Sequence, residues 1–364
     1  MLRKQPQGAR MGLRLGLIGL ILAGCIWSLF SQPRGAAQPD IRVFSGQTMG
    51  TYYTIKVLWN PALAEEDERR IKNAIQEQLD LVNQRMSTYR ADSELSRFNR
   101  FDSTEPFEIT KPTLDVFTLA QDVSKVTGGA FDITVGPLVN AWGFGPDPPT
   151  LSSRQNHEST ISEEQIQRLR SRVGYQHLHI DRDAFTVRKD VPEMYCDLSG
   201  IAKGYGVDRV FQALSGLGLD SFMIEVGGEI RTKGTKAGRP WRIAIEKPSE
   251  STRVIHEVLN FPKQGLALAT SGDYRNYYEA NGKRYSHTID PRTGRPVEHN
   301  LASVSVLAST CTAADAYATA LNVMGPDRGL EFARDHNLAA MFITRTGAGA
   351  FTETRTPAYE HLSD

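Results

Sequence analysis

Residues 51–86 read TYYTIKVLWNPALAEEDERRIKNAIQEQLDLVNQRM and place a strand pattern directly before a helix pattern. Thr51–Leu58 is rich in β-branched and aromatic residues, which predicts a β-strand. Glu65–Met86 repeats its apolar residues at the spacing of an amphipathic helix. The apolar residues that share one face of this helix are Ile71, Ile75, Leu79, Val82 and Met86.

The same two patterns continue along the chain without a regular strand–helix–strand alternation. Leu114–Val126 has helical periodicity, and Ser162-x-x-Gln165 is a capping-box pattern that opens another helix. The mixture predicts an α+β fold of mixed sheets with packed helices. Because 364 residues exceed the usual size of one compact core, we expect two subdomains. Further strand patterns cover His177–Ile180, Phe185–Arg188, Ser221–Val226, Trp241–Glu246, Leu266–Thr270 and Ser303–Leu307.

Residues 1–24 have the pattern of a secretory signal. Four basic residues and no acid accompany a short apolar run, Leu15–Leu22, which small residues follow. This run is shorter than the roughly 20 apolar residues that span a membrane. Leu22-Ala23-Gly24-Cys25 resembles the lipobox of bacterial lipoproteins, in which the cysteine is acylated and becomes the first residue. The alternative is an uncleaved anchor helix that continues through Phe30.

The remaining chain divides into three further parts. Residues 25–40 are rich in Pro, Gly and polar side chains and predict a flexible tether. Residues 41–345 are expected to form the functional region and residues 346–364 a C-terminal tail. Within the functional region, Phe144–Ser162 is predicted to be a long surface excursion because Pro, Ser and Asp dominate it.

Charge and cysteine content narrow the possible functions. The chain has 42 basic and 42 acidic residues, so there is no basic excess and no electrostatic case for nucleic-acid binding. Cys196 and Cys311 lie in apolar or small-residue surroundings, which favours free buried thiols. A disulfide between them is the alternative, since an exported protein can form one.

Two glycine-rich segments have features of ligand-binding loops. In Gly128–Pro137 the glycines permit a ligand to approach the backbone, and nearby aromatic residues can stack on a planar ring. An ordinary glycine-rich turn before a strand explains this segment equally well. Asp197–Gly206 predicts a strand end, a turn and a helix that starts near Ala202, so Lys203 at a helix start can bind a phosphate.

Two later segments carry candidate catalytic and metal-binding side chains. His287 precedes the turn sequence Asp290-Pro291, and an imidazole suits proton transfer, although a lone histidine is more often structural. Asp315 and Thr319 are four residues apart on one helix face and offer hard oxygen ligands for Mg²⁺. The alternative for Asp315 is a capping acid in the first helical turn after Thr312.

Together with Met49-Gly50-Thr51, Ser87-Thr88-Tyr89 and Ser93–Asn99, these segments resemble the ApbE family of flavin transferases, from about Phe44 to Gly325. The resemblance implies a flavin-binding cleft between the subdomains and Mg²⁺-dependent transfer of FMN from FAD to a Thr or Ser hydroxyl of an acceptor protein, with release of AMP. It implies that His287 accepts the proton of this hydroxyl. The implied metal ligands are the Gly200 carbonyl, Asp315 and Thr319. The implied FAD contacts are Met49, Tyr89, Ala130, Phe131, Asp132, Asp197, Lys203 and Ile289.

This sequence departs from some relatives at two positions of the site. Ala318 stands where some relatives carry an Asp, which makes a second metal less expected. Lys203 stands where some relatives have an acid, so its contact with FAD can differ in kind.

The resemblance and the signal together give expectations about place and partners. The acceptor is expected to be an extracytoplasmic protein, a subunit of a membrane redox complex. The chain itself is expected to be held on the periplasmic side by the lipid on Cys25, with the inner membrane favoured over the outer. Two alternative functions are a metal-dependent FAD pyrophosphatase and an FAD-binding lipoprotein without turnover.

Overall fold

The computed structural model of this chain describes residues 40–60, 62–146, 161–248, 254–272, 277–280, 283–347 and 350–363. Residues Ile41–Asp364 form one compact unit. The predicted signal, Cys25 and nearly all of the predicted tether lie outside the described residues, as does most of Phe144–Ser162. Among the described residues no helix is both long and apolar enough to cross a membrane.

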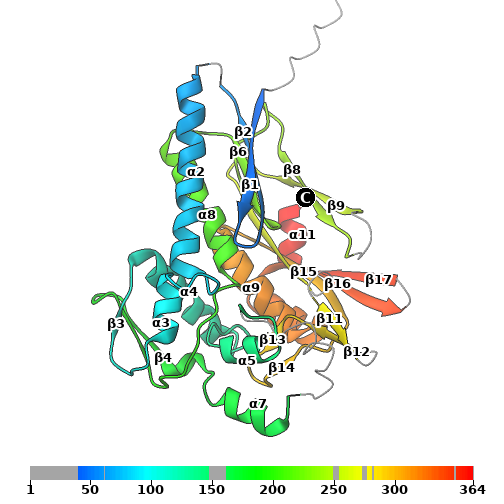
Figure 1. Ribbon diagram of the computed structural model, residues 1–364. Coiled ribbons are helices and arrows are strands. Elements are labelled where there is room, and N and C mark those ends of the chain that lie inside the picture. Colours follow the sequence, from blue (N-terminus) through cyan, green and yellow to red (C-terminus); the bar gives the residue numbers. More distant parts are fainter. Residues whose placement is uncertain are drawn as a thin grey trace, which may run out of the picture. The chain divides into compact units, whose positions relative to one another are not determined.

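An antiparallel sheet forms the centre of this unit (Figure 1). In the described part of the chain it has eight strands in the order β1-β2-β6-β7-β10-β15-β16-β17, and each neighbouring pair is antiparallel. An antiparallel sheet with separate helices confirms the predicted α+β class. The strands are β1 (Ile41–Thr48), β2 (Thr51–Leu58), β6 (Phe222–Val226), β7 (Glu229–Lys233), β10 (Ala267–Gly272), β15 (Leu301–Ala308), β16 (Ala339–Gly347) and β17 (Ala350–Arg355).

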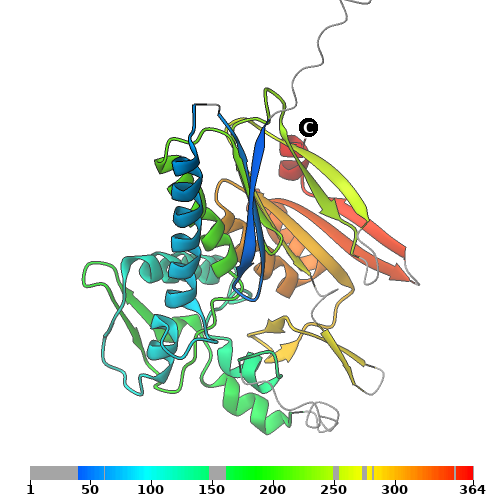
Figure 2. The same ribbon diagram turned by 45° about the horizontal axis from the view of Figure 1, so that its top comes forward.

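Helices cover one face of the sheet, and a hairpin with a short helix covers the other (Figures 1 and 2). Side chains alternate between the two faces: Ile224 of β6 packs toward the helices, whereas its neighbour Met223 packs toward the hairpin. The helices on the first face are α2 (Glu65–Met86), α8 (Ala202–Gly216), α9 (Cys311–Met324) and α10 (Pro326–Asp335). The elements on the second face are β8 (Trp241–Glu246), β9 (Ile255–Phe261) and α11 (Pro357–Ser363).

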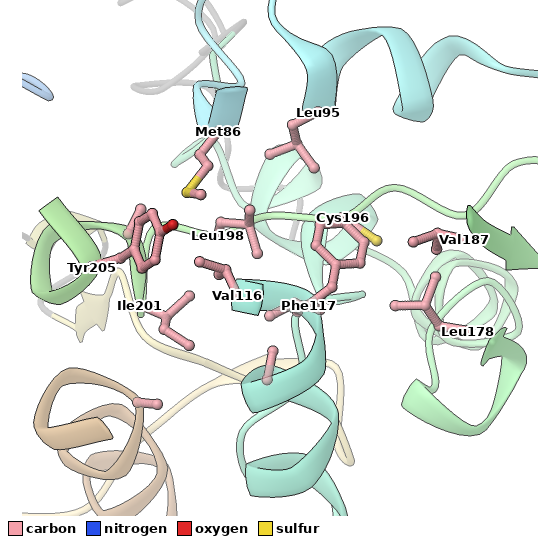
Figure 3. Packing of buried hydrophobic residues seen from close by; sticks show 14 of the residues in the cluster. Met86, Leu95, Val116, Phe117, Leu178, Val187, Cys196, Leu198, Ile201 and Tyr205 are labelled. Carbon is pink, nitrogen blue, oxygen red and sulfur yellow. The ribbon is translucent and has the colours of Figure 1, made fainter. Parts of the chain in front are cut away.

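A second group of elements packs around the C-terminal end of α2, at the bottom of Figure 1. Its core contains Phe98, Phe117 and Leu95, which belong to one hydrophobic cluster. Figure 3 shows Leu95 and Phe117 within this cluster. The elements are α3 (Glu94–Arg100), β3 (Phe107–Glu108), α4 (Lys111–Val126), η1 (Tyr175–His177), β4 (Leu178–Asp181) and β5 (Thr186–Lys189). The remaining elements are α5 (Gly136–Ala141), α7 (Glu163–Arg170), β11 (Tyr277–Ala280), β12 (Lys283–Ser286), β13 (Ile289–Asp290) and β14 (Arg295–Pro296).

Several predicted elements match the structure closely. The patterns at Thr51–Leu58, Glu65–Met86 and Trp241–Glu246 coincide with β2, α2 and β8, and α8 begins at Ala202 as expected. The capping box of α7 is present: Ser162 Oγ accepts from the Gln165 N–H, and Gln165 Oε1 accepts from the Ser162 N–H.

Two further expectations concern the C-terminus and the cysteines. The predicted tail is residues 346–364; within it, residues 350–355 form β17 and residues 357–363 form α11, β17 pairs with β16, and Tyr359 of α11 is buried. Cys196 and Cys311 are both free and buried, which confirms the favoured prediction.

Candidate functional site

Residues 194–198 form an extended segment whose alternate side chains anchor it in the core, and a turn at 199–201 follows. Met194, Cys196 and Leu198 are buried, whereas Asp197 and Ser199 are not. Figure 3 shows Cys196 and Leu198 reaching into the cluster above α4. A two-residue period puts neighbouring side chains on opposite sides, so burial of one set directs Asp197 and Ser199 outward.

Asn99 of α3 fixes the backbone of this segment. Its Nδ2 donates to the Cys196 carbonyl at 2.9 Å, and its Oδ1 accepts from the Cys196 N–H at 2.8 Å. The next residue, Asp197, donates its N–H to the Ile133 carbonyl at 2.7 Å. The segment that leads to Gly200 is therefore held from two sides.

Helices α8 and α9 approach closely at two glycines. Thr319 Oγ1 of α9 donates to the Gly200 carbonyl at 3.3 Å. One turn further, the Gly204 N–H of α8 donates to Oδ2 of Asp315 at 2.9 Å. A Cβ on Gly204 would lie 2.3 Å from the Cys311 carbonyl oxygen, so glycine at 204 is what permits this approach. The three implied metal ligands therefore come together where α8 begins.

The capping alternative for Asp315 is wrong. Helix α9 starts at Cys311, and its N-cap is Thr310, whose side chain accepts from the Ala313 N–H. Asp315 lies beyond the first helical turn, and its carboxylate is bound by α8 rather than by its own helix start. The Thr312-x-x-Asp315 pattern was misleading because the real cap lies two residues earlier.

The start of α9 is instead bound by Asp208 of α8, a residue that the sequence analysis missed. Its buried carboxylate accepts from the N–H groups of Cys311 at 3.0 Å and Thr312 at 2.8 Å, and from Thr312 Oγ1 at 2.5 Å. Arg231 of β7 completes the cluster through Nη1 at 2.5 Å. Asp208 thus sets the position of the helix that carries Asp315 and Thr319.

Lys203 stands between two acids at this site. Its Nζ lies 3.3 Å from Oε1 of Glu229 and 3.8 Å from Oδ1 of Asp315, and it donates to the Ser199 carbonyl at 3.4 Å. Burial alone would lower the pKa of Lys203, but the carboxylates of Asp315 and Glu229 raise it above its ordinary range. Burial raises the pKa of Glu229 to about 8 and also raises that of Asp315, while Lys203 opposes both shifts.

The donor set of Gly200, Asp315 and Thr319 fits a hard divalent cation. A main-chain carbonyl, a carboxylate and a hydroxyl are the oxygen ligands that Mg²⁺ accepts, together with substrate phosphate oxygens. Within the described ranges no three His, Cys, Asp or Glu side chains cluster to hold a metal ion. A cation here would therefore depend on one carboxylate, neutral oxygens and the phosphates of a bound nucleotide.

The predicted flavin-contact residues of the glycine-rich segment are mostly buried. Ala130 is 1% exposed, and Phe131 is 3% exposed with its ring 3.4 Å from where a Cβ on Gly200 would lie. Asp132 accepts three hydrogen bonds from the protein: Oδ1 from the N–H and Oγ1 of Thr134, and Oδ2 from the N–H of Tyr175. Burial raises the pKa of Asp132, although these hydrogen bonds act to lower it. Its carboxylate therefore already shapes the surrounding turns.

Met49 and Tyr89 come from two loops next to these segments. Met49 (φ 48°) and Gly50 (φ 71°) form the two-residue turn between β1 and β2, and Met49 Cε lies 2.8 Å from where a Cβ on Gly206 would be. Tyr89 is 72% exposed, which leaves its ring available to a ligand. Partial burial and the charge of Asp197 raise the pKa of Tyr89.

His287 lies on the short loop between β12 and β13, and Ile289 is the first residue of β13. Ile289 is buried in a cluster with Trp142, and the rings of Phe144 and His287 meet edge-on with centroids 6.3 Å apart. This loop is connected to α9, because Asn322 Nδ2 donates to Thr288 Oγ1 at 3.1 Å. The helix that carries the proposed metal ligands therefore also supports the loop of His287.

The structure adds three residues to the predicted site: Asn99, Asp208 and Glu229. Two of them had a signal in the sequence: Gly227-Gly228-Glu229 follows a predicted strand and resembles a hairpin turn, and Asn99 ends the segment Ser93–Asn99 that carries part of the resemblance. Asn99 and Asp208 act through contacts with residues about 100 positions away, which no local pattern reveals.

Comparison with known proteins places this geometry among flavin transferases. A profile described as the ApbE family matches residues 49–342. A protein named FAD:protein FMN transferase from Vibrio cholerae is 45% identical over 331 residues, which cover 91% of this chain and 92% of the relative. A protein of the same name from Haemophilus influenzae is 41% identical and covers 94% and 98%.

Solved structures of flavin transferases have the same fold as this chain. The flavin transferase ApbE from Vibrio cholerae matches with a TM-score of 0.78 and 44% identity over 89% of this chain and 99% of its own. The apo form of the flavinyl transferase ApbE from Pseudomonas stutzeri also matches with a TM-score of 0.78, at 37% identity over 90% and 98%.

Proposed function

The chain belongs to the ApbE family and transfers FMN from FAD to a protein, and from this premise we propose that the transfer depends on Mg²⁺, ends on a Thr or Ser hydroxyl of the acceptor and releases AMP. The observation that carries the proposal is the meeting of the Gly200 carbonyl, Asp315 and Thr319 beside Lys203, where α8 begins. FAD is the substrate, and its pyrophosphate is the group that this cluster of oxygens and one ammonium suits.

Phosphoryl-type transfer needs positioning and charge neutralisation more than covalent catalysis. The residues of the site have separate roles in meeting these two needs. Bound Mg²⁺ supplies positive charge to the pyrophosphate. Gly200, Asp315 and Thr319 hold the place of that ion, and Lys203 offers a second positive charge at the helix start. Tyr89 is exposed and offers its ring to the flavin, whereas Phe131 packs beneath Gly200 and Met49 packs against Gly206.

His287 is proposed to accept the proton of the attacking hydroxyl. The hydroxyl oxygen forms a bond to the phosphorus of the FMN half, the bond from that phosphorus to the bridging oxygen breaks, and AMP leaves with the bridging oxygen. An imidazole is the side chain best suited to accept a proton at neutral pH. The connection of Thr288 to Asn322 keeps the loop of His287 next to α9.

The N-terminal sequence suggests where the enzyme acts. We propose that residues 1–24 are removed, that Cys25 carries the lipid, and that the enzyme acts on the periplasmic side of a membrane. A tether of residues 25–40 reaches on the order of tens of ångströms. The acceptor would then be a membrane protein, such as a redox-complex subunit, whose target hydroxyl lies close to the bilayer.

Incubation of the full chain with FAD, Mg²⁺ and a Thr-containing acceptor peptide tests the proposal. We expect a covalent flavin–peptide adduct by mass spectrometry, AMP in equal amount, and no adduct when a chelator removes the metal. An unmodified peptide under every metal condition would refute the proposed acceptor chemistry. AMP and free FMN without acceptor would identify FAD hydrolysis as the competing activity of the same site.

A further inference from the structure

Glu229 is an acid of the site that the transfer described above does not use. It begins β7 directly after the turn Gly227-Gly228, and it is 2% exposed. Its Oε1 faces Lys203, whereas its Oε2 is buried without a hydrogen-bond partner among the described residues. Burying a carboxylate with one oxygen unpaired is unfavourable. The ion pair with Lys203 is the interaction that offsets this cost at Glu229.

The turn before Glu229 accommodates the lysine. Gly227 has φ +61°, and a Cβ there would lie 3.4 Å from Cδ of Lys203 and 2.8 Å from Cγ2 of Thr51. Gly228 has φ +105°, a conformation that other residues rarely adopt. The hairpin therefore brings its first residue, Glu229, and the stem of Lys203 together.

The ammonium of Lys203 is shared unequally between the two acids. It lies 3.3 Å from Glu229, whereas its 3.8 Å separation from Oδ1 of Asp315 exceeds a hydrogen-bond distance. The other oxygen of Asp315, Oδ2, already accepts from the Gly204 N–H. Oδ1 is consequently the oxygen of Asp315 that a metal ion can take, and the lysine forms a 3.8 Å ion pair with it that is longer than a hydrogen bond.

We propose that Glu229 is a positioning residue that acts through Lys203: it holds the ammonium away from Oδ1 of Asp315 and so keeps this oxygen available to the divalent cation. The inference rests on the Mg²⁺ site of the proposed function. Without the charge of Glu229, Asp315 becomes the nearer anion for the ammonium. The existing Lys203–Asp315 ion pair would then shorten to a direct hydrogen bond and compete with the metal.

Titration of Mg²⁺ into the purified full chain, alone and with FAD bound, followed by calorimetry, tests this role. Glu229→Gln keeps the shape of the side chain, and we expect it to weaken Mg²⁺ binding by about tenfold or more. A crystal structure of this variant should place Nζ of Lys203 about 2.8 Å from Oδ1 of Asp315. Glu225→Gln is the matched control, because Glu225 lies on the same hairpin and accepts from the Gly228 N–H at 2.9 Å; its effect should stay within about twofold.

Lys203→Met separates action through the lysine from a direct effect on the metal. In a chain that already carries Lys203→Met, Glu229→Gln should weaken Mg²⁺ binding by a factor at least about fivefold smaller than in the natural chain. An equal or larger cost there, or an unchanged affinity in Glu229→Gln itself, overturns the positioning role while the metal site stands. A natural chain that binds no Mg²⁺ either alone or with FAD bound overturns the metal site and this role together.

Discussion

The Gly204 N–H donates a 2.9 Å hydrogen bond to Oδ2 of Asp315, so the first turn of α8 binds the carboxylate of a different helix. This bond orients the acid before any ligand arrives, and it leaves Oδ1 turned toward Lys203. Groups that are oriented in advance need no rearrangement during the reaction, which makes their electrostatic effect larger.

Asp315→Asn should abolish transfer while preserving the fold. The amide oxygen can still accept from the Gly204 N–H, but the charge that holds a cation is lost. We expect the rate of flavin transfer to fall at least about 100-fold, and the free energy of unfolding to change by about 1 kcal/mol or less.

Asp335→Asn, at an exposed position near the end of α10, is the control for removing an acid as such. It should leave both measurements unchanged. Full transfer activity in Asp315→Asn would remove this carboxylate from the metal site.

The sequence predicted Asp315 as a metal ligand because two oxygen-bearing side chains four residues apart must share a helix face. The same sequence could not show that Gly204 binds this acid, since the two residues are 111 positions apart. Long periodic segments such as α2 were predicted with their bounds. Two-residue strands such as β13 and β14 were not, because so few residues contain no period.

Asp208→Ala should destabilise the fold strongly, because the buried carboxylate binds the start of α9 and an arginine at once. Removing it leaves two helix N–H groups and Arg231 without their anion. We expect the free energy of unfolding in urea to fall by about 3–5 kcal/mol. Asp220→Ala, at a side chain 94% exposed, should change it by less than about 0.5 kcal/mol. Equal stability of the two variants would refute the anchoring role of Asp208.

Asn99→Ala should weaken FAD binding although Asn99 is not among the predicted FAD contacts. Its loss leaves the N–H and carbonyl of Cys196 unpaired and loosens the segment that leads to Asp197 and Gly200. We expect about 1–3 kcal/mol of lost stability and a KM for FAD that rises more than kcat falls. Asn260→Ala on the exposed side of β9 is the control. A variant with reduced stability and unaltered KM would restrict Asn99 to a structural role.

Lys189 provides a pH-dependent test of the core around α3. It is fully buried, and its Nζ lies 3.4 Å from the Phe98 carbonyl and 3.3 Å from that of Met194. Burial lowers the pKa of Lys189 below its ordinary value of 10.5, so the native chain releases this proton before the unfolded chain does. In that window the unfolded state binds more protons, and stability rises with pH.

Lys189→Met removes this linkage and should therefore change the shape of the pH profile. Urea denaturation from pH 7 to pH 10.5 should show the natural chain gaining stability relative to Lys189→Met as pH rises, because the cost of a buried ammonium disappears when it loses its proton. Lys111→Met, at a side chain 69% exposed, corrects for the loss of a lysine elsewhere. If the difference between the natural chain and Lys189→Met were constant over this range, or moved the other way, Lys189 would titrate alike in both states and its burial would carry no electrostatic cost.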